Sequence, residues 1–281
     1  YYHAWSSEII YFLNQQRSLL ALQKAEKMKK QAFADRYPYG IFSCIRTMGH
    51  IYKSRGNFDL SAQYYQEALD YMLKNMPDQD PSQLYSSLAE YYRNTQKDYA
   101  TALDYCEKAL KSAKTERNIA QAMIEKCLIL FRQGRIDEFN DCYKEAVQMA
   151  DRCKLSANVS LLIAHIYRNI LDKQYEQAHA HADQLPNKGP QYHAYIYEYA
   201  KDYPNAIKYL RKYHQQQDST NNLLQLSDIA ELNTQIGAER LKMENIQATS
   251  RYRITLFSIV TGFLLLSLLF LMLYLHRKQI G

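Results

Sequence analysis

Apolar and small residues recur along most of the chain at the three- and four-residue spacing of amphipathic helices. The most regular stretch contains two such segments, with Gly49 and Tyr52 in the first and Tyr65 and Ala68 in the second. Gly56 lies between them, where the lack of a side chain permits a tight turn. This pattern predicts two antiparallel helices that pack through small and aromatic side chains.

The same pattern recurs three more times, which predicts a stack of helical pairs. Its first-helix positions Tyr52, Tyr92, Leu130 and Tyr167 are 40, 38 and 37 residues apart. The second copy has a turn one residue longer than the first, and the fourth copy is weaker. The residues that carry the four copies are Gly49, Tyr52, Gly56, Phe58, Tyr65, Ala68 and Leu69, then Ala89, Tyr92, Tyr99, Ala102, Ala109 and Leu110, then Cys127, Leu130, Gly134, Ile136, Tyr143 and Ala146, and finally Ala164, Tyr167, Tyr175 and Ala178.

These residues resemble the tetratricopeptide repeat, in which two antiparallel helices pack through small and aromatic residues at fixed offsets. The spacings exceed the motif's length of about 34 residues, so we expect longer helices or connections, such as Asn75 to Pro81. The resemblance implies an all-α fold, a tetratricopeptide-type solenoid of helical hairpins. The first helix of each pair lines its concave face.

The segments outside the four copies are more degenerate, as the terminal repeats of a solenoid usually are. A polar run at 215–222 (QQQDSTNN) indicates a break after the last helical pair. We expect an N-terminal helical hairpin at 1–38, about four repeats at 39–186, a degenerate C-terminal hairpin at 187–218, a connector helix at 219–253, one transmembrane helix at 254–275 and the start of a truncated cytoplasmic part at 276–281.

A ligand or partner groove is predicted on the concave face. Arginines near the ends of three successive first helices, Arg93, Arg132 and Arg168, would form a basic ladder for carboxylates or phosphates. The alternative is a solvated helix face. The chaperone-type clamp for acidic peptide termini is not expected, because its set of Asn and Lys is missing. The candidate groove residues are Arg46, His50, Lys53, Glu90, Arg93, Asn94, Arg132, His165, Arg168 and Asn169.

Composition narrows the function classes. Only 8 glycines and 6 prolines among 281 residues favour an all-helical chain. The net charge of +6, without a basic run interleaved with aromatics, indicates no nucleic-acid partner for this region. The 26 tyrosines either fill the repeat cores or form a ligand surface, and core filling is the favoured interpretation.

No catalytic or metal chemistry is predicted. The sequence lacks the common nucleotide-binding, metalloprotease and nucleophile motifs, so we expect no catalytic residues and no cofactor. His179 and His181 point in different directions on a helix and make a poor metal site. Five cysteines without a CxxC spacing argue against a disulfide framework or zinc site, although a redox role for one of them stays open.

The C-terminal part of the sequence predicts a connector and a membrane span. Ile254 to Leu275 contains no charged residue over 22 positions and would reach roughly 33 Å as a helix, enough to cross a bilayer. Basic residues flank both ends, so charge leaves its orientation undecided. The connector either pairs in a homodimer or docks on the solenoid as an amphipathic helix. The seam of such a dimer would be Ile229, Leu232, Ile236, Met243 and Ile246.

Repeats, connector, one span and a basic exit (HRKQ) together resemble the sensor half of membrane-bound histidine kinases of Bacteroidetes. The resemblance implies a two-component sensor region that binds a peptide, protein or small molecule in its groove and relays the signal through the span. It also places the repeats in the periplasm and the span in the inner membrane, as does a chain that begins at Tyr1 as if a secretory signal were cleaved. The alternatives are a membrane-anchored scaffold and a membrane-bound helix-turn-helix transcriptional regulator.

Overall fold

The computed structural model describes residues 1–155, 158–186, 189–226 and 228, and beyond these only residues 245, 246, 249, 252, 253, 257 and 261. The chain divides into two compact units, Tyr1–Asp228 and Ile229–Gly281. The predicted dimer seam and membrane span lie outside the described residues, except for Ile246 in the seam and Phe257 and Thr261 in the span. The following paragraphs concern the first unit.

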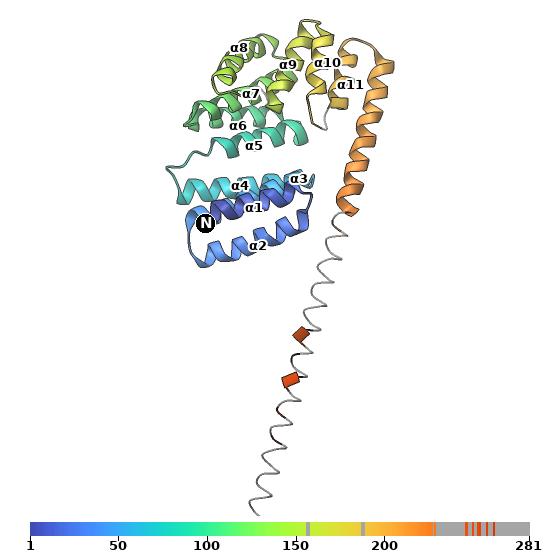
Figure 1. Cartoon of the computed structure of the whole chain (residues 1–281). Coiled ribbons are helices and arrows are strands. Elements are labelled where there is room, and N and C mark those ends of the chain that lie inside the picture. Colours follow the sequence, from blue (N-terminus) through green and yellow to red (C-terminus); the bar gives the residue numbers. More distant parts are fainter. Residues whose placement is uncertain are drawn as a thin grey trace, which may run out of the picture. The chain divides into compact units, whose positions relative to one another are not determined.

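The first unit is a stack of antiparallel helical pairs (Figure 1). The pairs are α1 (Tyr2–Asn14) with α2 (Ser18–Ala34), α3 (Pro38–Ser54) with α4 (Phe58–Asn75), α5 (Ser82–Tyr91) with α6 (Tyr99–Ser112), α7 (Glu116–Arg132) with α8 (Ile136–Arg152), and α9 (Val159–Leu171) with α10 (Tyr175–Asp183). A further helix, α11 (Gly189–Tyr199), packs on α9 and α10. The predicted all-helical solenoid is therefore confirmed.

Small residues bring the paired helices close together. A side-chain carbon added at Gly49 on α3 would lie 2.7 Å from the ring of Tyr65 on α4, far inside van der Waals contact. Ser61 donates to the Gly49 carbonyl at 2.8 Å, which ties the two helices at the same level. Gly56, in the turn between them, has a φ of 74°, a conformation that glycine adopts without strain.

The longer turn of the second repeat is absorbed by a π-helical segment, η1 (Tyr92–Gln96), which extends α5. Lys97 then adopts the left-handed conformation, with a φ of 57°, at the turn position that Gly56 occupies in the first repeat. A π-turn accommodates one extra residue without ending the helix, and such turns are frequent at functional sites. The insertion places Arg93 and Asn94 at the end of the first helix of this pair.

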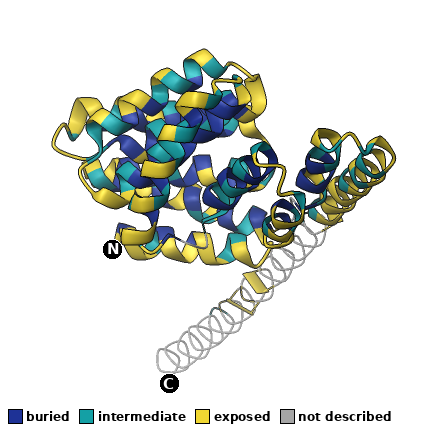
Figure 2. Ribbon diagram, turned by 90° about the horizontal axis from the view of Figure 1, so that it is seen from above, coloured by how far each residue is buried: buried dark blue, intermediate teal, exposed yellow. Residues whose placement is uncertain are grey.

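Buried side chains form two main cores with a small cluster between them. One core comes from α1 to α5, with Ile9, Met28 and Met48 among its buried members, and the other from α7 to α11. The small cluster combines Ala89, Ala102, Cys106 and Ile129. In Figure 2 the buried residues face the neighbouring helices, while exposed residues cover the outside of the stack.

The last helix of the unit is longer than the sequence predicts. Residues 203–226 are helical throughout, including the polar run 215–222 where a break was expected. This run contains no glycine or proline, and its exposed Gln and Asn side chains remain in water, so nothing in it ends a helix. The helix reaches into the first part of the predicted connector.

Asp228, just beyond this helix, contacts the first two helical pairs. Arg55 donates to both carboxylate oxygens of Asp228 at 2.7 and 3.1 Å, and Ser18 donates to the same carboxylate at 2.8 Å. Asp228 is 173 residues from Arg55 in the sequence, so the contact joins the C-terminal end of the unit to the turn after α3. For this residue, docking on the solenoid is the observed arrangement.

Candidate functional site

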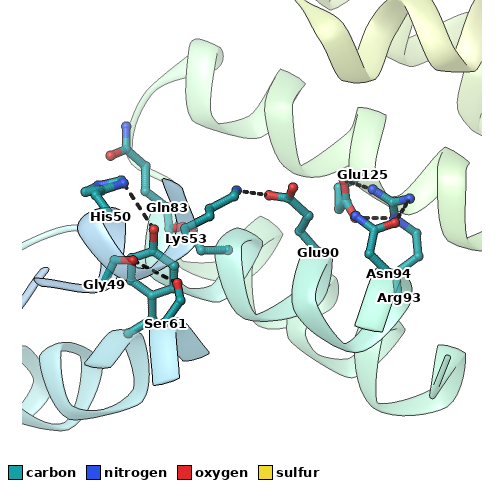
Figure 3. Close-up of polar contacts among 11 residues, drawn as sticks. Gly49, His50, Lys53, Ser61, Gln83, Glu90, Arg93, Asn94 and Glu125 are labelled. Carbon is teal, nitrogen blue, oxygen red and sulfur yellow. Dashed lines mark hydrogen bonds and ion pairs between the residues drawn. The ribbon is translucent and has the colours of Figure 1, made fainter. Parts of the chain in front are cut away.

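A buried ion pair occupies the middle of the solenoid. Arg93, on η1, donates to both carboxylate oxygens of Glu125, on α7, at 2.6 and 3.2 Å (Figure 3). Both residues are buried, with 6% and 5% of their surface exposed. Burial works against the charge of Arg93, but the Glu125 carboxylate outweighs it and raises the pKa of the guanidinium. The remaining Nη1 donates to the side-chain oxygen of Asn94 at 2.7 Å.

A second, more exposed ion pair joins α3 to α5. The Lys53 ammonium lies 2.6 Å from the Glu90 carboxylate, and each side chain is about one third exposed, at 40% and 33% (Figure 3). Burial lowers the pKa of Lys53, and the charge and hydrogen bond of Glu90 raise it further than burial lowers it. This pair links the first helices of two successive helical pairs.

Beside Arg93 a small cleft of about 80 Å³ opens between the ends of three first helices. It is lined by Arg93, Asn94, Lys97, Arg132, Tyr167, Gln191, Tyr192 and Tyr195. Three of these residues, Arg93, Asn94 and Arg132, belong to the predicted groove. The others come from α9, α11 and the turn after η1.

Arg132, at the end of α7, supplies positive charge to this cleft. Its guanidinium lies 5.5 Å from the centre of the Tyr195 ring, close enough for a cation–π contact. Burial again opposes the charge, and the nearby phenols of Tyr167 and Tyr99 raise the pKa of Arg132. Within the part of the chain that the structure describes, no carboxylate forms an ion pair with it.

The cleft walls are tyrosines fixed by ring contacts. Tyr167 stacks on Phe131 with ring centres 4.0 Å apart, and Tyr195 packs against Tyr167 at 5.8 Å. Burial raises the pKa of Tyr167, Tyr192 and Tyr195, so the phenols stay protonated and uncharged. The Tyr195 hydroxyl donates to the Tyr199 hydroxyl at 3.2 Å. The cleft therefore combines a cation, neutral phenols and an amide, which suits a negatively charged oxygen group.

Two further predicted groove residues, Arg168 and His165, have hydrogen-bond partners within the protein. Arg168 donates to Asn140 and, at 2.7 Å, to Asp172. The Nδ1 atom of His165 and the Tyr143 hydroxyl form a hydrogen bond at 2.6 Å. Asn169 is buried. With Arg93 paired to Glu125, two of the three arginines in the predicted ladder have carboxylate partners of their own.

At the other end of the predicted groove, His50 lies 3.0 Å from the Tyr65 hydroxyl through its Nδ1 atom. Partial loss of water around the ring, together with the positive charges of Arg46 and Lys53, lowers the pKa of His50 to about 4. Arg46 itself lies 5.2 Å above the Phe42 ring. This region is thus positively charged without contributing to the cleft.

Sequence reasoning missed Glu125, Lys97, Tyr192 and Tyr195. Glu125 could have been found, since a carboxylate in the apolar run of α7 needs a partner on the neighbouring first helix. The tyrosines of α11 could not, because that helix lies in the weakest part of the repeat pattern. Among the described residues no cluster of His, Cys, Asp or Glu could hold a metal ion.

Comparison with known proteins agrees with this architecture. Residues 47–71 match the tetratricopeptide repeat. No curated protein sequence matches the chain. The tetratricopeptide-type solenoid is similar to the Rap conjugation gene regulator of plasmid pLS20 in complex with the Phr* peptide, with a TM-score of 0.64 and 14% identity over 79% of this chain and 64% of that one.

Two further solved structures have a similar fold. NprR in complex with its cognate peptide NprX gives a TM-score of 0.52 at 14% identity, covering 80% of this chain and 71% of that one. PilW, a widely conserved type IV pilus biogenesis factor, gives 0.51 at 13% identity, covering 75% and 91%. At these identities the likeness concerns the fold. No helix in the described ranges is long and apolar enough to cross a membrane.

Proposed function

We propose that this solenoid binds a peptide or protein segment and that the cleft around Arg132 takes a carboxylate of that ligand. The observation that carries the proposal is the Arg132 guanidinium, which lies in a tyrosine-lined cleft and has no carboxylate partner in the described part of the chain. The planar guanidinium of an arginine matches the two oxygens of a carboxylate. The peptide complexes of NprR and the Rap regulator support a peptide as the ligand class.

The size of the cleft limits what enters it. About 80 Å³ accommodates a carboxylate and little more, so the rest of the ligand would lie along the first helices. Arg93 contributes little net charge, because Glu125 neutralises it. Its role in the proposal is to hold Asn94 in place at the rim.

The test is a titration of the purified chain with a labelled peptide library prepared in two forms, with a free C-terminal carboxylate and with an amide. The best-binding free acid should lose about 10- to 100-fold in affinity for Arg132→Gln, as expected for a charged hydrogen bond. Arg135→Gln is the matched control, because Arg135 pairs with Glu138 on the surface. Equal affinities for wild type and Arg132→Gln would contradict the proposal.

We further propose that the chain is the extracytoplasmic sensor and transmembrane region of a two-component histidine kinase. The uncharged stretch Ile254–Leu275 and the order of repeats, connector and span support this role. Ligand binding would then bias the connector that leads toward the membrane, since a ligand shifts signalling only by binding two arrangements with different affinity. The repeats would lie in the periplasm, and the span in the inner membrane.

Two measurements on the full-length protein test this role. A cysteine introduced at the exposed Lys111 should react with an impermeant maleimide in cells whose outer barrier is permeabilised, and protection would place the repeats in the cytoplasm. Autophosphorylation with radiolabelled ATP should change when a cleft-binding peptide is added. A protein without any phosphorylation would favour the scaffold or the transcriptional regulator instead.

A further inference from the structure

Two cysteines face each other inside the hairpin of α7 and α8. The Sγ atoms of Cys127 and Cys142 are 2.9 Å apart, and the Cys127 thiol donates to the Cys142 sulfur. Cys127 is fully buried and Cys142 is partly exposed. Among the described residues no other two sulfurs of cysteine lie within hydrogen-bond reach, and Cys44 donates to the Ala25 carbonyl instead.

We propose that Cys127 and Cys142 are a redox modification site, which forms a disulfide by exchange with an external disulfide such as oxidised glutathione. The Cys142 thiolate attacks one sulfur of oxidised glutathione, forms a mixed disulfide and releases one glutathione thiolate. Cys127 then gives up its proton and attacks the Cys142 sulfur, which releases the second glutathione. Two protein thiols are oxidised, one external disulfide is reduced, and the two protons end on the two glutathione thiols.

The two thiols suit different steps. Cys142 is the one that water and a small disulfide can reach, and the hydrogen bond from Cys127 lowers the pKa of its thiol, with burial opposing this effect and Lys126 adding to it. Cys127 is closed off from solvent, and the same hydrogen bond together with burial raises its pKa. It therefore reacts only within the molecule, where its position beside Cys142 compensates for the small thiolate fraction.

The surrounding helices hold the pair in place. α7 and α8 form one hairpin around the turn at Gly134, and the cysteines lie 15 residues apart on facing sides of it. A cross-link there closes a short loop in the unfolded chain and restricts its freedom. The oxidised protein should therefore melt at a higher temperature than the reduced one.

The experiment equilibrates the purified chain in glutathione buffers of increasing oxidised fraction, followed by alkylation, proteolysis and mass spectrometry. The five free thiols of the reduced protein should fall to three, with one cross-linked peptide pair that contains Cys127 and Cys142. The melting temperature should rise in step with the cross-link. Five alkylatable thiols at every buffer, or a cross-link through Cys106, would overturn the proposal.

Variants separate the two steps. Cys127→Ala retains a small residue at the helix contact and should leave Cys142 as a glutathione adduct, whereas Cys142→Ser should give neither adduct nor cross-link. Cys153→Ser, at the end of α8, is the control and should oxidise like wild type. Helical circular dichroism verifies that each variant is folded. A wild-type protein that stops at the glutathione adduct would also contradict the proposal.

Discussion

Arg93 and Arg132 both lie near the end of a first helix, yet their charges are balanced in different ways. Arg93 is buried and neutralised by Glu125 within hydrogen-bond distance, whereas Arg132 faces aromatic rings in an open cleft. A buried charge without a partner is costly, so the first arginine is tied to its neighbour. The second has no carboxylate partner among the described residues, so its charge is open to a ligand.

The buried pair of Arg93 and Glu125 predicts that neutralising Glu125 lowers the stability of the fold strongly. Glu125→Gln should lower the free energy of unfolding by about 3 kcal/mol, because Arg93 keeps its charge in a buried site without a counterion. The urea midpoint of helical circular dichroism measures the loss. Asp104→Asn, which breaks the exposed pair with Lys108, serves as control and should cost less than about 1 kcal/mol. Equally small losses of unfolding free energy in both variants would contradict the claim that burial makes the Glu125 charge more important than the Asp104 charge.

His50 predicts a pH dependence of stability. Its pKa of about 4 in the folded protein lies below the value of about 6.5 in an unfolded chain. As pH falls from 6.5 toward 4, the unfolded chain takes up a proton that the folded protein does not, so stability is lost across this window. Melting temperatures at pH 7 and 4.5 should differ less for His50→Gln than for wild type or the exposed His214→Gln. An unchanged difference in His50→Gln would contradict the assignment.

At the scale of elements, the sequence predicts part of η1 but does not predict the full length of the last helix. The longer second turn is visible in the spacing of Tyr92 and Tyr99, although spacing alone does not reveal that a π-turn absorbs the extra residue. The polar run 215–222 predicts a break only if polarity by itself ends a helix. Without glycine or proline, an exposed helix passes through it.

The contact of Asp228 with Arg55 and Ser18 predicts that the last helix is held at its far end. Asp228→Asn weakens a partly exposed charged contact worth about 1 kcal/mol, so amide exchange in residues 203–226 should speed up about 5-fold. Hydrogen exchange followed by mass spectrometry measures this segment separately from helices α5 to α8. The exchange rates of those helices should not change. Asp218→Asn, on the same helix, is the control. The same exchange rate of residues 203–226 in wild type, Asp228→Asn and Asp218→Asn would show that the contact does not hold the helix.

At the scale of the whole molecule, the repeat pattern predicts the solenoid because small and aromatic residues at fixed offsets determine how helices approach. Gly49 against Tyr65 shows this directly. The site is less predictable, because surface charges on first helices look alike in the sequence. Whether an arginine is paired depends on a neighbour such as Glu125, 32 residues away, and on the rotation of each helix.

The central claim is that Arg132 holds a carboxylate of the ligand, and a thermodynamic cycle tests it most directly. Calorimetric titration compares the free-acid and amide forms of the best-binding peptide on wild type and on Arg132→Gln. Wild type should bind the acid about 10-fold or more tightly than the amide, and Arg132→Gln should bind both forms equally. The same preference for the acid in both proteins would place the carboxylate elsewhere and contradict the account.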